Sequence, residues 1–113
     1  MKKVSLSPLE ARAFKRIKED PEFAEAFFED FAQRPLVAQL SILRRMGGLS
    51  QIQLASRMKV PQSFISKLEK TGTDHRLSVY ERLAKMLHTR LAFIPEGARI
   101  LLPQGKQRYR PAA

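Results

Sequence analysis

The chain has 113 residues, a formal net charge of +10 and no cysteine. This size fits one domain with short appendages, and the lack of cysteine excludes a disulfide framework and a thiolate metal site. No apolar run approaches the roughly 20 residues of a membrane-spanning helix, and the polar, charged start argues against a secretory signal. We therefore expect a cytoplasmic protein without a membrane partner.

The positive charge is unevenly distributed along the chain. Residues 1–30 contain 6 Lys or Arg and 7 Asp or Glu, a net charge of −1, whereas residues 31–113 contain 15 and 4, a net charge of +11. The two parts are therefore expected to meet different partners. A segment as basic as the second part favours a nucleic acid as its partner. The alternative is that water merely solvates its charges.

Two helix-start signals occur in residues 1–34, which we interpret as an N-terminal helical extension. The run Ser7-Pro8-Leu9-Glu10 combines an N-cap, a proline at the first position and a capping-box glutamate, so it predicts a helix to about residue 18. Asp20-Pro21 repeats the signal and predicts a helix over residues 21–33. That second helix sets four aromatic side chains on one apolar stripe opposite acidic residues: Phe23, Phe27, Phe28 and Phe31.

A third predicted helix begins at Pro35 and covers residues 35–46. Its apolar periodicity predicts Leu36, Leu40 and Leu43 as the buried face. Gly47-Gly48 then supplies a left-handed stop.

Three shorter helices are predicted after this stop. Ser50 caps a helix over residues 51–58, and Pro61 opens a helix that ends at Thr71-Gly72. Ser78 caps the last helix, which runs to residue 88.

Residues 51–70, "QIQLASRMKVPQSFISKLEK", match a helix-turn-helix closely. Ala55 is the small residue required where the two helices nearly touch. Apolar residues stand at each position that buries the angle between the helices: Leu54, Met58, Val60, Ile65 and Leu68. The alternative is two ordinary packed amphipathic helices, which would rarely match every one of these positions.

Over residues 36–87 the pattern resembles the lambda-repressor-like family of bacterial and phage regulators, the XRE or Cro/C1 type. The matching run is "LSILRRMGGLSQIQLASRMKVPQSFISKLEKT", followed by a helix after "RLSVYERLAKML". The resemblance implies a mainly α protein with a five-helix DNA-binding domain over residues 35–89. It departs from the family at Lys59, where glycine is usual; a left-handed lysine costs about 1 kcal/mol and would be placed to reach a phosphate.

The resemblance also implies a DNA interface, in which the second helix of the motif enters the major groove. The residues implied for base reading are Gln62, Ser63, Phe64 and Lys67. The residues implied for phosphate contacts are Gln51, Arg44, Arg57, Lys59, Lys70 and Arg76. A solvated surface charge is the alternative for each phosphate candidate. The family pattern further pairs Arg44 with Glu69, the alternative being two separate surface residues.

Phe64 stands between these polar residues on the same predicted helix. Since Ile65 and Leu68 occupy the core positions, the register turns Phe64 outward. It is expected to contact a thymine methyl group or a sugar–phosphate edge, the alternative being partial shelter by the preceding helix.

The flanks of the motif favour a narrower class. Residues 90–103 read as a strand, a turn at Glu96-Gly97 and a second strand, and residues 104–113 as a basic flexible tail. "EDPEFAEAFFEDFA" before the motif and "RLAFIP" after it resemble antitoxins of type II toxin–antitoxin systems. That resemblance implies a toxin-binding helix carrying the four phenylalanines; the alternative is that these rings pack within their own chain.

The predicted strand at residues 90–95 would expose an unpaired edge. Pairing it with the same strand of a second copy would give a homodimer that binds an inverted-repeat operator; a hairpin within one chain is the alternative. We expect a dimeric, sequence-specific repressor that regulates its own operon and neutralises a toxin. The alternatives are a stand-alone regulator and an interaction inhibitor with vestigial DNA binding.

Catalysis and cofactors are not expected. His75 and His88 have no neighbouring metal-ligand spacing. The sequence contains no glycine-rich phosphate loop and no nucleophile elbow, so we predict neither an enzyme nor a bound cofactor.

Overall fold

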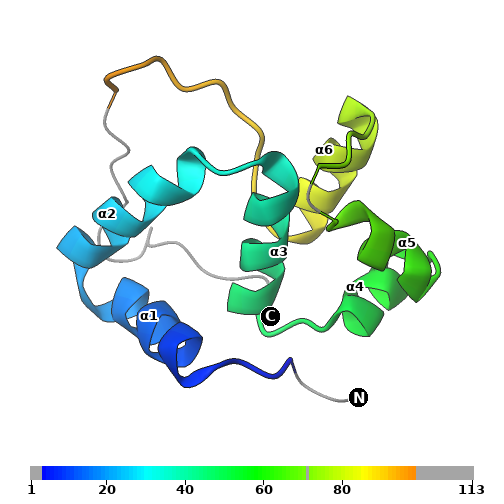
Figure 1. The fold of residues 1–113 in the computed structure, drawn as a ribbon, viewed down its shortest axis with the longest axis horizontal. Coiled ribbons are helices and arrows are strands. Elements are labelled where there is room, and N and C mark those ends of the chain that lie inside the picture. Colours follow the sequence, from blue (N-terminus) through cyan, green and yellow to red (C-terminus); the bar gives the residue numbers. More distant parts are fainter. Residues whose placement is uncertain (1–3, 71, 99–113) are drawn as a thin grey trace. The chain divides into compact units, whose positions relative to one another are not determined.

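The computed structural model describes residues 4–70 and 72–98. The described residues form six helices and no strand (Figure 1). The helices are α1 (Pro8–Glu19), α2 (Pro21–Ala32), α3 (Leu36–Met46), α4 (Gln51–Met58), α5 (Gln62–Leu68) and α6 (Leu77–Met86). They divide into two compact units: α1 and α2 belong to the first, and α3 to α6 belong to the second. Within the described part, residues 6–34 and 93–98 make up the first unit, and residues 4–5, 35–70 and 72–92 the second.

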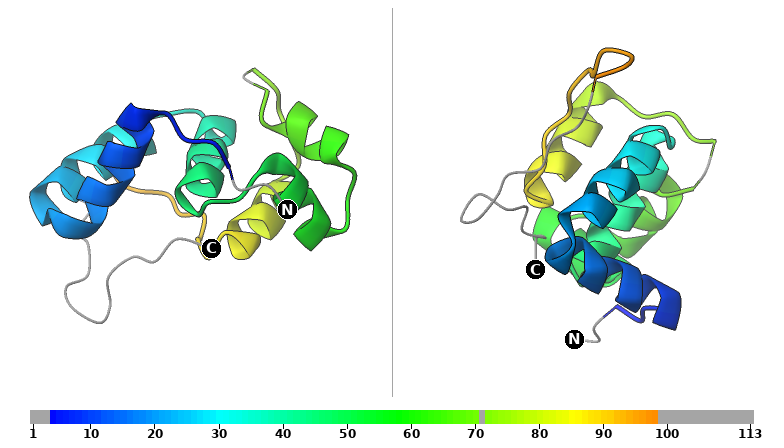
Figure 2. Two further views of the ribbon diagram at one scale, coloured as in Figure 1. Left: turned by 90° about the horizontal axis from the view of Figure 1, so that it is seen from below. Right: turned by 90° about the vertical axis from the view of Figure 1, so that its left-hand side faces the viewer.

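The first unit contains two helices that lie side by side (Figure 2). The Ser7 hydroxyl accepts the Glu10 N–H at 3.1 Å, and the Ser7 N–H donates to the Glu10 carboxylate at 3.0 Å, so the predicted capping box is confirmed. The Asp20 carboxylate accepts the N–H groups of Glu22 and Phe23 at 3.1 and 3.2 Å, which confirms the predicted start of α2. These local bonds satisfy donors that a helix otherwise leaves without an internal partner.

The second unit surrounds one apolar core. Its fully buried large side chains come from α4, α5, α6 and the two segments next to them: Leu49, Leu54, Met58, Ile65, Leu68, Leu83 and Leu87. On α3, Leu40 and Leu43 are buried as predicted, whereas Leu36 is 41% exposed. The prediction for Leu36 is wrong because this residue is the first of α3, where the apolar stripe extends past the packed turns of the helix.

Several predicted helix boundaries in the second unit are also wrong. Helix α3 begins at Leu36 with Pro35 as its N-cap, and α6 ends at Met86 rather than at residue 88. Ser78 does not cap α6: the helix begins at Leu77, and the first helical bond runs from the Val79 N–H to the Arg76 carbonyl at 2.9 Å. Arg76 has an extended backbone and therefore takes the capping position without a side-chain bond. Helix α5 ends at Leu68 rather than at Thr71-Gly72, since Glu69 already forms its C-cap.

The predicted strand at residues 90–95 is wrong for the described part of the chain. Residues 91–98 are all exposed and have no regular structure apart from the predicted turn, in which the Ala98 N–H donates to the Pro95 carbonyl at 3.1 Å. A strand needs a partner for its backbone groups, and no described segment supplies one. The rest of the predicted second strand, from residue 99, and the tail at 104–113 lie outside the described residues.

The predicted five-helix count is wrong as well. Only α3 to α6 lie between residues 35 and 89 in the described part. Beyond α6 the chain passes through His88, which has a left-handed backbone, and then through Pro95 and Gly97, so no fifth helix forms among these residues. No described helix has both the length and the apolar character needed to cross a bilayer.

Candidate nucleic-acid interface

Helices α4 and α5 pack on one another across a short turn, in the arrangement predicted for a helix-turn-helix. Ala55, the residue at the close approach, is buried. Of the predicted apolar set, Leu54, Met58, Ile65 and Leu68 are buried and Val60 is half-buried. Because α5 is held through Ile65 and Leu68, its opposite face remains at the surface.

The turn between the helices contains a left-handed lysine. Lys59 has φ 59° and ψ 44°, the conformation that the family position requires of its usual glycine. The N–H groups of Lys59 and Val60 donate to the carbonyls of Ser56 and Ala55 at 3.2 and 3.0 Å, which closes the end of α4.

A cation from another helix holds the same helix end. Arg82 of α6 donates through Nη2 to the carbonyl of Met58, the last residue of α4. A cation is favourable at this negative end of the helix dipole. Sequence reasoning missed this contact, because nothing local to Arg82 indicates that α6 packs at the end of α4.

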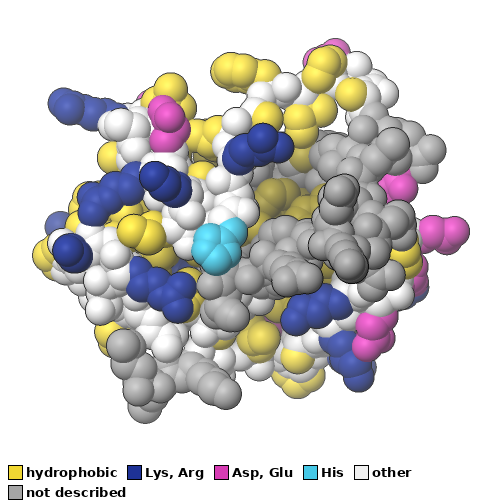
Figure 3. Space-filling model, turned by 180° about the vertical axis from the view of Figure 1, so that it is seen from behind, with side chains coloured by type: hydrophobic (Ala, Val, Ile, Leu, Met, Phe, Trp, Pro, Cys, Tyr) yellow, Lys and Arg dark blue, Asp and Glu magenta, His cyan; other side chains and the backbone are white. Residues whose placement is uncertain are grey.

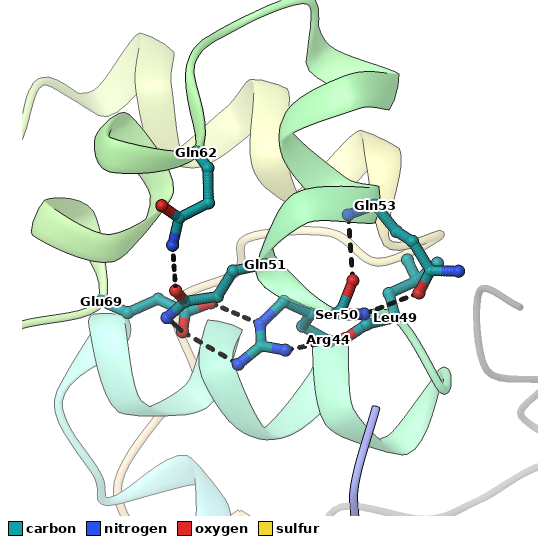
Figure 4. Close-up of polar contacts among 7 residues, drawn as sticks. All are labelled: Arg44, Leu49, Ser50, Gln51, Gln53, Gln62 and Glu69. Carbon is teal, nitrogen blue, oxygen red and sulfur yellow. Dashed lines mark hydrogen bonds and ion pairs between the residues drawn. The ribbon is translucent and has the colours of Figure 1, made fainter. Parts of the chain in front are cut away.

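A buried ion pair connects α3 with the end of α5 (Figure 4). Arg44 Nε and Nη2 donate to the two carboxylate oxygens of Glu69 at 2.7 and 3.0 Å, and Nη1 donates to the Leu49 carbonyl at 2.7 Å. The two side chains are only 5% and 8% exposed. The predicted pairing is confirmed and the surface alternative is wrong. Arg44 has an internal anchoring role here, and its phosphate contact stays a prediction.

Two glutamines extend this ion pair to the surface. Gln51 Nε2 donates to Glu69 Oε1 at 3.1 Å, and Gln62 Nε2 donates to Gln51 Oε1 at 2.8 Å (Figure 4). An ionised carboxylate only accepts hydrogen bonds, so Glu69 holds the amide nitrogen of Gln51 towards itself and the amide oxygen towards Gln62. This leaves Gln62 with its own amide oxygen and one N–H for another molecule.

The contact between the two glutamines was not predicted from the sequence. Gln51 and Gln62 were assigned separately, one to a phosphate and one to a base. The signal was present, since a glutamine stands at the first position of each helix of the motif, and the packing of the two helices brings these positions together.

The outward face of α5 is polar except for one ring. Gln62, Ser63 and Lys67 are exposed, and Phe64 is 38% exposed. The other phosphate candidates are also exposed: Arg57, Lys59, Lys70 and Arg76. On the face drawn in Figure 3, Lys and Arg are more frequent than Asp and Glu over the part of the surface formed by α4 to α6. An excess of positive charge suits a polyanionic ligand.

The four phenylalanines predicted as a partner surface pack on one another along α2. Phe27 is central: its ring centroid lies 5.3 Å from that of Phe28 and 6.4 Å from those of Phe23 and Phe31. The guanidinium of Arg16 on α1 lies 4.5 Å from the Phe23 ring centre. All four rings are half-buried, so each one combines a packing role with an accessible edge.

Comparison with known proteins identifies the class of the second unit. A family model described as a helix-turn-helix domain matches residues 35–92, slightly more than half of the chain. The chain therefore belongs to the helix-turn-helix family, and it is of the XRE, lambda-repressor-like type indicated by its sequence. Residues 35–92 constitute a DNA-binding domain of that family.

Among curated proteins, the chain is similar to two that are named Antitoxin HigA1. They come from Mycobacterium tuberculosis strains CDC 1551 / Oshkosh and ATCC 25618 / H37Rv, and each is 38% identical over 80 residues. The match covers 71% of this chain and 54% of each relative, so the chain spans about half the length of the curated relatives it matches. No solved structure gives a significant match.

Proposed function

We propose that this protein is a sequence-specific DNA-binding repressor and an antitoxin, which represses its own operon and neutralises a cognate toxin. The observation that carries the DNA-reading part is the Gln62 amide, oriented by Gln51 and Glu69 at the start of α5. The likeness to proteins named Antitoxin HigA1 supports the antitoxin part. The proposed activity is binding and includes no catalytic step.

In this proposal α5 lies in the major groove with its first turn against the base edges. The free amide oxygen and N–H of Gln62 form the donor–acceptor pair that complements adenine N6 and N7. Lys67 lies one turn further on and donates to guanine. Arg57, Lys59, Lys70 and Arg76 neutralise phosphates and position the domain without selecting a sequence.

Two copies would bind together. A closed homodimer relates its two recognition helices by a two-fold axis. Recognition helices about 34 Å apart require an operator with an inverted repeat.

The toxin would bind to the first unit. Helix α2 combines half-buried phenylalanines with the acidic residues Glu22, Glu25, Glu29 and Asp30, a combination that suits a basic protein with an apolar groove. The charge difference between residues 6–34 and residues 35–92 supports this assignment, since a basic toxin is attracted to the acidic segment and DNA to the basic one.

The DNA-reading assignment is tested with Gln62→Ala and Lys67→Ala combined in the full chain. Affinity for the DNA upstream of its own gene is measured by fluorescence anisotropy against a scrambled duplex. Each lost base contact is worth about 1–3 kcal/mol, so we expect at least a thirtyfold loss of affinity for the specific DNA. Lys15→Ala, which removes one cation from α1, is the control and should change it less than twofold. Unchanged sequence preference in the double variant would refute the assignment.

The toxin assignment is tested with Phe27→Ala and Phe31→Ala combined. The partner tested is a small basic protein encoded by a reading frame adjacent to this gene, where one is found. Its affinity is measured by calorimetry, with circular dichroism to check that α1 and α2 remain folded. Leu9→Ala, at another exposed apolar residue of the same unit, is the control. We expect the double variant to lose tenfold or more in affinity for the toxin and the control to keep the wild-type affinity. No binding by the wild-type chain, with operator binding intact, would identify a stand-alone regulator instead.

A further inference from the structure

Phe64 lies outside the buried core of the second unit. It is 38% exposed on a helix whose other large apolar side chains, Ile65 and Leu68, are buried. It also lies outside the polar chain that connects Gln62 with Arg44. The outward face of α5 therefore keeps one aromatic surface in water, next to side chains suited to polar base edges.

The helical register separates Phe64 from Gln62. At about 100° per residue the two side chains are about 200° apart, on opposite flanks of the outward face. Ser63 lies between them and points directly away from the core, and Lys67 lies between Ser63 and Phe64. The outward face of α5 is therefore polar along its centre line and aromatic along the flank opposite Gln62.

The major groove has a matching pattern. The hydrogen-bonding groups of the base pairs lie towards the middle of the groove floor, and its apolar group is the C5-methyl of thymine. This methyl group projects beside the backbone of its own strand, at the side of the groove floor. We infer that Phe64 packs on the 5-methyl group of a thymine, at a base pair other than the one contacted by Gln62. This inference rests on the proposed DNA-reading function and makes Phe64 a specificity-determining residue of it.

The consequence is a preference for thymine over uracil at one position of each half-site. The two bases have the same hydrogen-bonding edge, so only an apolar contact distinguishes them in the groove. Burying one methyl group changes an affinity about fourfold. We expect a thymine-to-uracil ratio of roughly three to ten per half-site, and a ratio near one after Phe64 is truncated.

The experiment begins with selection of the preferred duplex from a randomised pool by the full chain. Each thymine of that duplex is then replaced, one at a time, by deoxyuridine, which removes only the methyl group. Dissociation constants are measured for the wild type, Phe64→Ala, Phe64→Leu and the control Ile52→Ala. Ile52 is 63% exposed on α4. Its replacement by alanine therefore removes a comparable exposed apolar side chain outside the outward face of α5. Thermal melts establish that each variant is folded.

The expected result is one sensitive thymine in each half-site. Replacing this thymine weakens DNA binding by the wild type and by Ile52→Ala equally. It leaves binding by Phe64→Ala unaffected and has an intermediate effect on binding by Phe64→Leu. The inference is overturned if no thymine is sensitive, or if the sensitivity persists in Phe64→Ala. Failure to select any preferred duplex would instead refute the proposed DNA-reading function, so the two failures are distinguishable.

Discussion

The helical segments of the two units, residues 6–34 and 35–92, have opposite net charge. Residues 35–92 contain 10 Lys or Arg against 3 Asp or Glu, whereas residues 6–34 contain 5 against 7. Both are helical, and both use a serine capping box to start a helix. Their secondary structure is therefore similar, and the difference lies in what each presents at its surface: cations and amides on one, aromatic edges and carboxylates on the other.

Both units contain arginine–carboxylate pairs, and one pair from each illustrates a different physical role. Arg44 and Glu69 are buried and connect α3 with the end of α5. Arg34 and Asp30 lie one turn apart, with side chains 52% and 70% exposed. The first pair fixes the orientation of the Gln51 amide, which in turn holds the Gln62 amide. The second pair is a solvated surface contact that contributes little to stability.

The largest expected effect separates these two ion pairs. Glu69→Ala leaves the Arg44 guanidinium buried without a counter-charge, so we expect a loss of about 3–5 kcal/mol in the free energy of unfolding. Asp30→Ala, the control, should lose no more than about 0.5 kcal/mol. Urea unfolding followed by circular dichroism measures both. Equal losses in the two variants would show that burial does not distinguish the pairs.

A smaller effect is expected at the turn of the motif. Lys59→Gly removes the strain of a left-handed lysine and should stabilise the fold by up to about 1 kcal/mol. If Lys59 contacts a phosphate, the dependence of log affinity on log salt concentration should also fall by about 0.9. His88→Gly is the matched control, because His88 also has a left-handed backbone, with φ 56°. It should stabilise the fold and leave the salt dependence unchanged; an equal change in both variants would argue against the phosphate contact.

The smallest effect concerns the acidic unit. The Phe23 backbone N–H is the main cause of a lowered pKa for the Asp20 carboxyl; hydrogen bonding and charge from Arg16 and the Glu22 N–H add to it, and desolvation opposes it. A carboxyl with a lowered pKa stabilises the fold above its unfolded pKa, near 3.8, and this stabilisation is lost as pH falls through the folded value.

Thermal melts between pH 2 and pH 5 therefore give a direct comparison with Asp20→Asn. The asparagine keeps a capping oxygen but does not titrate at this position. We expect the wild type to lose more stability than the variant as the pH falls below about 3.8. Parallel curves would exclude Asp20 as the titrating cap.

The features predictable from sequence were those with local causes. Ser7, Asp20 and Ser50 begin helices because each side chain bonds to backbone groups two or three residues ahead. The core positions of the motif were predictable for the same reason, since one helical period places Ile65 and Leu68 on one face. A local pattern also gave a wrong prediction: Ser78 is a favourable capping residue, but α6 begins at Leu77 with the extended Arg76 as its N-cap.

The features that sequence could not supply depend on contacts between distant residues. The strand predicted at residues 90–95 has favourable composition, but a strand forms only against a partner. The bond from Arg82 to Met58 and the chain from Gln62 through Gln51 to Glu69 require knowledge of which helices pack together. The base-reading, phosphate and toxin residues remain predictions, now with a defined geometry for Gln62.

The central claim is that DNA reading resides in α5 and not in the acidic unit. One anisotropy titration of the promoter duplex tests it, with the wild type, the combined Gln62→Ala and Lys67→Ala variant, and the combined Phe27→Ala and Phe31→Ala variant. We predict that the combined Gln62→Ala and Lys67→Ala variant loses at least thirtyfold in affinity for this duplex, from base contacts worth about 1–3 kcal/mol each. The combined phenylalanine variant should change that affinity less than twofold. Equal losses in both variants, or a loss confined to the phenylalanine variant, would contradict the claim.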